Sequence, residues 1–179
     1  TVGGQLTVTS ALGKGSEFRL SFRAEASEAL APARPVETTP DRATALSNIR
    51  ALVVDDTQTN RIVVRSMLCA LGADCLEAGD GVSALHLVQT EQIDVILMDI
   101  WMPESNGFEV LQTIRALEGR PSSIPVIAVT ADVVREQSDH YFARGFAGYL
   151  SKPIDMDKLA AVVRNAVSND ANTSDRSRV

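Results

Sequence analysis

The sequence contains no long hydrophobic run, and no apolar segment approaches the roughly 18 to 20 residues that a helix needs to span a bilayer. It also contains no run of lysine or arginine, and its 179 residues carry a formal net charge of −6. Such a chain lacks the basic surface that binds nucleic acid or an anionic membrane. We therefore expect no nucleic-acid partner and no direct membrane contact for this stretch of chain.

Cysteine is scarce, with only Cys69 and Cys75. Their spacing matches no zinc-binding pattern, and two cysteines do not make a disulfide scaffold. We interpret both as small, half-buried apolar residues in a reducing cytoplasm, with a membrane anchor left open for the parent protein. The chain also lacks an initial methionine and a signal peptide, so we expect position 1 to be a cut point in a longer protein.

The first 48 residues divide into two segments of different composition. Within residues 1–24, the stretches 5–10 and 17–22 alternate apolar and polar residues on either side of a glycine-rich turn, which predicts a β-hairpin with one apolar face. Residues 25–48 contain three prolines and no aromatic residue. This composition is typical of a flexible linker that cannot bury a core.

From Ile49 to residue 167, strand patterns and helix patterns alternate five times. The predicted strands are short and mostly apolar, as in a sheet that is covered on both faces. The first predicted helix carries an apolar stripe of Ile62, Val63, Met67, Leu68 and Leu71. Its end is predicted at Gly72, and Asp80, Asn106 and Asp155 are predicted to cap later helices.

This alternation predicts an α/β fold, a doubly wound five-stranded parallel sheet with five helices on its two faces. The polar tail at residues 168–179 is predicted to be disordered.

Polar side chains stand at the carboxyl ends of four of the predicted strands. They are Asp55, Asp56, Asp99, Thr130 and Lys152. In open parallel sheets the binding site forms beyond these strand ends, so we expect the five side chains to converge. Three neighbouring carboxylates repel one another in a low dielectric, which requires either a nearby cation or protonation of one acid. Oxygen ligands alone favour a hard divalent cation, and Mg²⁺ fits best.

A cation, an ammonium group and a hydroxyl donor arranged around one carboxylate form a receptor for a phosphoryl group. We identify Asp99 as the candidate nucleophile, because carboxylates form aspartyl-phosphates in enzymes. In such transfers the protein acts mainly by positioning groups and neutralising charge.

The segment from about residue 49 to 167 resembles a receiver domain of two-component signalling. The likeness rests on the Asp55-Asp56 pair, "MDIWMP" around Asp99, "VTA" at 129–131 and "YLSKP" at 149–153. It implies a flavodoxin-like sheet with strand order 2-1-3-4-5. It also implies that Asp99 accepts a phosphoryl group from a phosphohistidine on a kinase dimerisation domain or on a histidine phosphotransfer protein.

The same resemblance implies a role for each matching position. Asp56, Asp99 and the backbone carbonyl of Trp101 would bind Mg²⁺ directly, and Asp55 would hold it through water. Lys152 would neutralise the phosphoryl oxygens and Thr130 would donate a hydrogen bond to one of them. Tyr149 matches an aromatic residue that swings inward when Thr130 moves, which forms a two-state switch.

Two further positions are expected to tune the lifetime of the phosphoryl group. The large ring of Trp101, two residues after Asp99, is placed to shield the acyl phosphate from water. Asp132, two residues after Thr130, is placed to orient an attacking water. Together they predict an intermediate lifetime.

Residues 1–24 resemble the closing hairpin of a histidine-kinase ATPase domain, on the stretch "VGGQLTVTSALGKGSEFRLSF". The other ATPase motifs and the phosphorylatable histidine helix are absent, so this chain holds no kinase active site. The order of hairpin, linker and receiver implies a hybrid sensor histidine kinase as the parent. Two alternatives stay open: a stand-alone response regulator, and a Mg²⁺-dependent phosphohydrolase that uses an aspartyl-phosphate. The latter needs a second acid two residues after Asp99, where this chain has Trp101.

Overall fold

The computed structural model describes residues 4–11, 15–22, 44–103, 105–131 and 138–176. The chain divides into two compact units, Thr1–Glu37 and Thr38–Val179. In the first unit, β1 (Gly4–Ala11) pairs antiparallel with β2 (Gly15–Phe22), so the predicted hairpin is present. Its tight-turn residues 12–14 lie outside the described residues.

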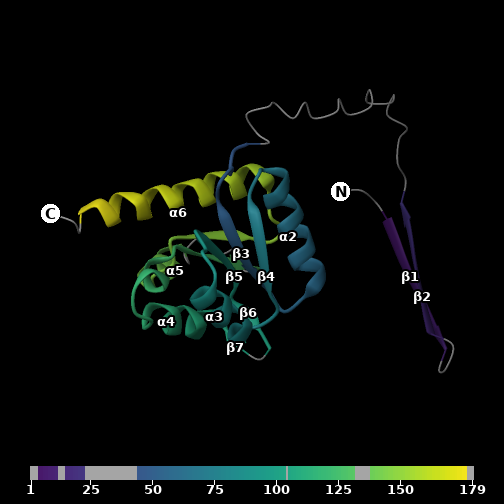
Figure 1. Cartoon of the computed structure of the whole chain (residues 1–179). Helices are drawn as coiled ribbons and strands as arrows, with labels where there is room; N and C mark the ends of the chain where they lie inside the picture. Colours follow the sequence, from purple (N-terminus) through teal and green to yellow (C-terminus); the bar gives the residue numbers. More distant parts are fainter. Residues whose placement is uncertain (1–3, 12–14, 23–43, 104, 132–137, 177–179) are drawn as a thin grey trace. The chain divides into compact units, whose positions relative to one another are not determined.

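The second unit alternates strands and helices along the chain (Figure 1). The strands of its main sheet are β3 (Arg50–Val54), β4 (Asp74–Ala78), β5 (Val95–Asp99), β8 (Val126–Thr130) and β9 (Gly148–Ser151). The helices are α2 (Gln58–Ala70), α3 (Gly81–Thr90), α4 (Gly107–Arg115), α5 (Ser138–Ala143) and α6 (Met156–Arg176). Short elements complete it: β6 (Trp101–Met102), β7 (Ser105–Asn106) and a 3-10 helix at Arg120–Ser123.

The five main strands are parallel and lie in the order β4-β3-β5-β8-β9. Counted along the chain, this is the order 2-1-3-4-5, so the predicted doubly wound fold is confirmed. The small β6–β7 pair between β5 and α4 was not predicted, because two-residue strands leave no periodic signal in the sequence.

Two apolar layers cover the sheet. One layer joins side chains of α3, α4 and α5 to one face of the strands, and the other joins α2 and α6 to the opposite face (Figure 1). Every residue of β5 and β8 is buried, which explains why these strands read as continuous apolar runs rather than as alternating patterns.

The predicted helix boundaries are set by short local contacts. Asp80 accepts a hydrogen bond from the Ser83 N–H at 2.7 Å, and Asn106 accepts one from the Phe108 N–H at 3.0 Å. Asp155 caps α6 in the same way. Gly72 follows the end of α2 with a φ of 91°, a conformation that glycine adopts without steric cost. Each side-chain cap stabilises its helix by about 1 kcal/mol.

The predicted apolar stripe on the first helix is partly wrong. Ile62 and Val63 are 51% and 47% exposed, whereas Val64, Leu68 and Leu71 are buried. The buried residues repeat at the helical spacing of four and three, so Ile62 and Val63 fall outside this face. The helix simply carries more apolar residues than its buried stripe holds. Cys75 is half-buried as predicted, but Cys69 is exposed.

Two predicted boundaries also differ from the structure. Leu46, assigned to the linker 25–48, is fully buried, and its N–H donates to the carbonyl of Leu71 at 2.8 Å. The folded unit therefore begins before residue 49. At the other end, α6 continues to Arg176, although residues 168–179 were predicted to be disordered. No proline or glycine lies between Met156 and Arg176, so no residue type in this stretch forces the helix to stop.

Candidate functional site

The register of the sheet brings the predicted polar residues to one edge. Asp99 pairs with Val129 across β5 and β8, and Thr130 pairs with Ser151 across β8 and β9. Asp55 and Lys152 directly follow β3 and β9. One carboxylate oxygen each of Asp55, Asp56 and Asp99 lies within 4.8 Å of the other two. The expected convergence of three carboxylates is therefore present.

Lys152 bridges the two buried acids of this cluster. Its Nζ lies 2.8 Å from Oδ2 of Asp55 and 2.7 Å from Oδ2 of Asp99. Its backbone N–H donates to the carbonyl of Thr130 at 2.7 Å, which fixes the start of the side chain at the same edge. Burial alone disfavours the ammonium form, but the hydrogen bonds to the two acids outweigh it and raise the pKa of Lys152.

Asp55 is held by partners from three segments. Its carboxylate accepts hydrogen bonds from the N–H of Thr57 at 2.9 Å, from the side-chain amide of Asn60 at 3.1 and 3.2 Å, and from Lys152. Burial acts to raise the pKa of Asp55, but the hydrogen bonds from Lys152, Thr57 and Asn60 lower it overall. Asp55 is therefore ionised at neutral pH and held in a fixed orientation.

Asp99 has fewer compensating partners. It accepts hydrogen bonds from Lys152 and, at 3.2 Å, from the N–H of Trp101. Burial raises the pKa of Asp99, and these partners offset the effect only in part, because the nearby charge of Asp55 adds to it. Two adjacent carboxylates thus have their pKa values moved in opposite directions, a pattern typical of functional sites.

Asp56 and Trp101 face the solvent at the mouth of the site. Asp56 is exposed and lines a pocket of about 300 Å³ together with Gly79, Asp80, Met102, Pro103 and Ser105. The side chain of Trp101 is 66% exposed, just beyond Asp99. The pocket therefore gives solvent access to Asp56, one of the three carboxylates of the cluster.

The cluster fits a divalent cation. It offers oxygen ligands from three carboxylates against one ammonium group, so negative charge remains uncompensated when all three are ionised. Oxygen ligands with excess negative charge are what hard divalent cations select in proteins.

Thr130 lies at this edge, at the end of β8, and Tyr149 lies on the neighbouring strand β9, paired with Ala128. Thr130 is fully buried, whereas Tyr149 is 40% exposed. The ring of Tyr149 stacks on Tyr141 at 6.0 Å between centroids and meets Phe142 edge-on at 6.3 Å. Asp132, predicted to orient a water, lies outside the described residues.

Two residues of the site were missed by sequence reasoning. Asn60 and Arg61, in the first turn of α2, bond to the carboxylate and to the backbone carbonyl of Asp55. The available signal was their position: both are polar residues in the first turn of the helix that follows Asp55 and Asp56, where a side chain can reach back to the end of the strand.

With this geometry described, comparison with known proteins gives a clear result. The family model of the response regulator receiver domain matches residues 51–164. The chain belongs to this family. Its relatives include sensor histidine kinase RcsC of Salmonella typhi, 38% identical over 133 residues, which are 74% of this chain and 14% of RcsC. The aerobic respiration control sensor protein ArcB of Escherichia coli is 32% identical over 164 residues, 91% of this chain and 20% of ArcB.

Solved receiver structures agree with the fold. The receiver domain of a sensor histidine kinase from Pseudomonas aeruginosa, described with a magnesium ion coordinated in its active-site cleft, is 28% identical with a TM-score of 0.60, covering 67% of this chain and 98% of that one. The chemotaxis protein CheY4 of Vibrio cholerae is also 28% identical, with a TM-score of 0.60, covering 66% and 98%.

This receiver domain is thus homologous to those of hybrid sensor histidine kinases, and the chain spans only a small part of these relatives. Among the helices that the structure describes, none is both long enough and apolar enough to cross a membrane.

Proposed function

We propose that Asp99 accepts a phosphoryl group from a phosphohistidine, and that Mg²⁺ bound by the acidic cluster supports the transfer. The observation that carries this proposal is the bridge of Lys152 between Asp99 and Asp55, at 2.7 and 2.8 Å. It leaves Asp99 in contact with an ammonium group and within 4.8 Å of the other two carboxylates that would hold the metal.

The chain supplies the parts of the transfer as follows. An oxygen of ionised Asp99 attacks phosphorus, the phosphorus–nitrogen bond of the phosphohistidine breaks, and the imidazole nitrogen keeps the electron pair and takes a proton. Lys152 exchanges its contact with Asp99 for one with a phosphoryl oxygen. Thr130, buried at the end of β8, donates its hydroxyl to another phosphoryl oxygen.

Asp56, Asp99 and the backbone carbonyl of Trp101 are the proposed direct ligands of Mg²⁺, with Asp55 acting through water. When bound, Mg²⁺ neutralises charge on the phosphoryl oxygens and on the carboxylates. The lowered pKa of Asp55 supports its part, since a carboxylate that is ionised at neutral pH attracts the cation.

Tyr149 is the proposed reporter of phosphorylation. A shift of Thr130 toward the phosphoryl group would open space beside β8 and draw the ring of Tyr149 inward. The stacking of Tyr149 on Tyr141 supports this role, because leaving that position would alter the packing of α5. Such a local change, read out at a surface, is how receivers act as two-state switches.

We further propose that the parent protein is a hybrid sensor histidine kinase in the cytoplasm, anchored or not, and that residues 1–24 close its ATPase domain. The similarity to ArcB supports this, since a match over 164 residues extends upstream of the receiver domain. The partner would be a kinase dimerisation domain or a histidine phosphotransfer protein. Residues 25–43 would then be the linker.

Incubation with acetyl phosphate and Mg²⁺, followed by intact mass measurement, tests the proposal. We expect the wild-type chain to gain one phosphoryl group, and we expect no gain for Asp99→Asn or after chelation of the metal. Sustained hydrolysis of many phosphoesters without a phosphorylated chain would instead indicate a phosphohydrolase.

A further inference from the structure

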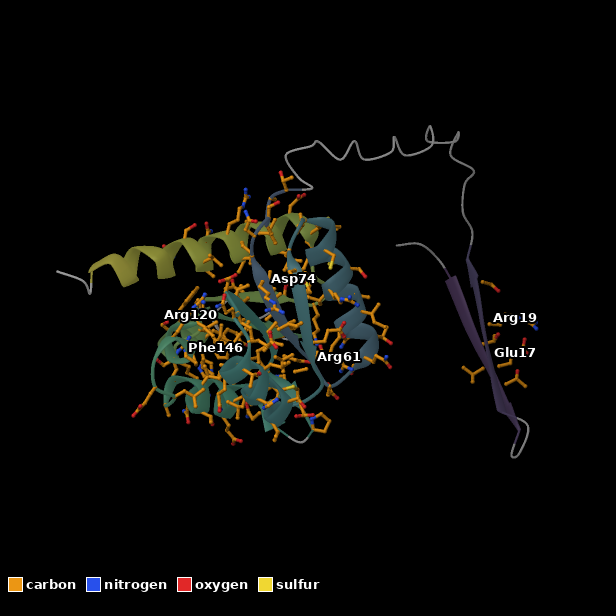
Figure 2. The ribbon with its side chains drawn as sticks, viewed as in Figure 1. Glu17, Arg19, Arg61, Asp74, Arg120 and Phe146 are labelled. Carbon is orange, nitrogen blue, oxygen red and sulfur yellow. The ribbon has the colours of Figure 1, made fainter. Side chains whose placement is uncertain are left out.

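Arg61, labelled in Figure 2, lies near the start of α2. Its side chain binds the backbone of the acidic pair, Asp55 and Asp56. Its Nη1 donates to the carbonyl of Asp55 at 2.6 Å and to the carbonyl of Asp56 at 3.2 Å. The side chain is only 17% exposed, so water competes little for these contacts. A single guanidinium nitrogen thus ties together two residues whose carboxylates belong to the acidic cluster.

The guanidinium is itself held in place from the sheet. Nε of Arg61 forms an ion pair with Oε2 of Glu77 at 3.5 Å, and Glu77 lies on β4, paired with Val53 of β3. Arg65, one turn further along α2, contacts the other oxygen of Glu77 at 3.4 Å. Glu77 therefore connects Arg61 to the strand that delivers Asp55.

The backbone at Asp55 and Asp56 needs such support because the sheet ends there. The last ladder contact is the N–H of Asp55 to the carbonyl of Ala78 at 3.3 Å, and the chain then leaves the sheet toward α2. The planar guanidinium presents several donors in fixed directions, so it can hold two carbonyls and a carboxylate at once. A lysine ammonium has one nitrogen and no such fork.

We propose that Arg61 is a positioning residue for the metal site: through the carbonyls of Asp55 and Asp56 it fixes the carboxylates that take the divalent cation. This inference rests on the proposed function, because it assigns Arg61 to the same site. The positive charge of Arg61 repels Mg²⁺. If Arg61 acted through its charge alone, its loss would raise the affinity for Mg²⁺. If it positions the carboxylates, its loss lowers that affinity.

The test is Mg²⁺ affinity in the full chain, measured by the fluorescence of Trp101. The chain has one tryptophan, two residues from Asp99, so its signal reports on this site. We expect Arg61→Lys, which keeps the charge but loses the fork, to weaken Mg²⁺ binding about tenfold, as removal of residues that orient metal ligands does elsewhere. Arg65→Lys is the matched control, on the same helix and the same glutamate, and should leave the affinity unchanged.

A dissociation constant for Arg61→Lys within about twofold of the wild type would overturn the inference. Equal weakening by Arg65→Lys would also overturn it, because the effect would then be a general loss of stability. If Arg61→Lys does not fold, Glu77→Gln replaces it, and unchanged Mg²⁺ affinity in that variant refutes the positioning role. A wild-type chain that binds no Mg²⁺ would contradict the proposed function itself, which separates the two failures.

Discussion

At the scale of single residues, the chemistry of the site depends on one ammonium group shared by two buried acids. Lys152 lies within hydrogen-bond distance of both Asp55 and Asp99, yet the pKa of Asp55 is lowered and that of Asp99 is raised. The difference comes from the additional donors, Thr57 and Asn60, that serve Asp55. The lowered pKa of Asp55 suits its proposed role as a charged residue beside the metal, whereas Asp99 is the less stabilised carboxylate of the two.

Replacing Asp99 by asparagine should stabilise the metal-free protein at neutral pH, because the raised pKa of Asp99 means that its ionised form destabilises the folded state. Its pKa is raised in the folded state, so the folded chain retains a proton that the unfolded chain releases near 3.8. Stability therefore falls as pH rises from that value through the folded pKa, and asparagine removes this loss. Urea unfolding at several pH values measures the effect.

Asp55→Asn is the matched comparison and should behave in the opposite way. Because the folded pKa of Asp55 is lowered, its contribution to stability is present above 3.8 and is lost as pH falls through the folded value. The variant should be less stable than wild type at neutral pH and approach it in acid. If both variants shift stability in the same direction at neutral pH, the assigned charge states are wrong.

Trp101 is expected to slow hydrolysis of the phosphorylated chain by shielding the acyl phosphate. Trp101 is 66% exposed, and its backbone N–H donates a hydrogen bond to Oδ1 of Asp99 at 3.2 Å. Removing the ring in Trp101→Ala should therefore accelerate dephosphorylation, by about threefold to tenfold if the ring contributes roughly 1 kcal/mol to the barrier. Decay of the phosphorylated mass over time measures the rate, and an unchanged rate would reject the shielding role.

At the scale of elements, Gly107 fixes the path of the loop that follows Asp99. A Cβ at this position would lie 2.6 Å from the carbonyl oxygen of Asp99 and 3.0 Å from Cα of Ile100. Both obstacles are backbone atoms, which cannot move away as a flexible side chain can. The first turn of α4 therefore packs directly on the backbone of Asp99, the proposed phosphoacceptor.

Gly107→Ala should cost about 1–3 kcal/mol of unfolding free energy and should also reduce phosphorylation of Asp99, since the added methyl displaces its backbone. Gln112→Ala is a suitable control, because Gln112 lies on the same helix and is exposed. Thermal unfolding and intact mass measure the two effects. Equal losses in both variants would show that the close approach at Gly107 has no special consequence.

The ends of helices could be predicted where they depend on residues close in the sequence. The caps at Asp80, Asn106 and Asp155 and the stop at Gly72 depend on neighbours a few residues away, so they can be read from sequence. The strand-end residues could be placed because parallel strands end at a common edge.

What could not be predicted depends on contacts between distant segments. The exposure of Ile62 and Val63 depends on which face of α2 packs on the sheet. The helix has more apolar residues than one face holds, so the sequence does not identify the buried face. The bonds from Asn60 and Arg61 to the acidic pair depend on where the first turn of α2 meets β3. Neither relation leaves a periodic signal in the chain.

At the scale of the whole molecule, the folded receiver unit extends further toward the N-terminus than its motifs indicate. Leu46 is buried in the layer that joins α2 and α6 to the sheet. Leu46→Ala should therefore destabilise the protein by about 2–5 kcal/mol, the usual range for a buried leucine. Val82→Ala, at a position 80% exposed, should change stability by less than about 0.5 kcal/mol. Chemical denaturation of both variants checks this. An unchanged free energy of unfolding in Leu46→Ala would show that the segment around Leu46 belongs to the linker and not to the folded unit.

The account as a whole rests on one covalent bond, between phosphorus and the carboxylate of Asp99. Its most direct test is to phosphorylate the chain with acetyl phosphate and Mg²⁺, reduce the acyl phosphate with borohydride, and locate the modified residue by peptide mass spectrometry. Reduction of an aspartyl-phosphate leaves homoserine. We predict homoserine at position 99, with Asp55 and Asp56 intact. Modification of Asp55 or Asp56, or a phosphoryl group carried by His86 or His140 instead, would contradict the account.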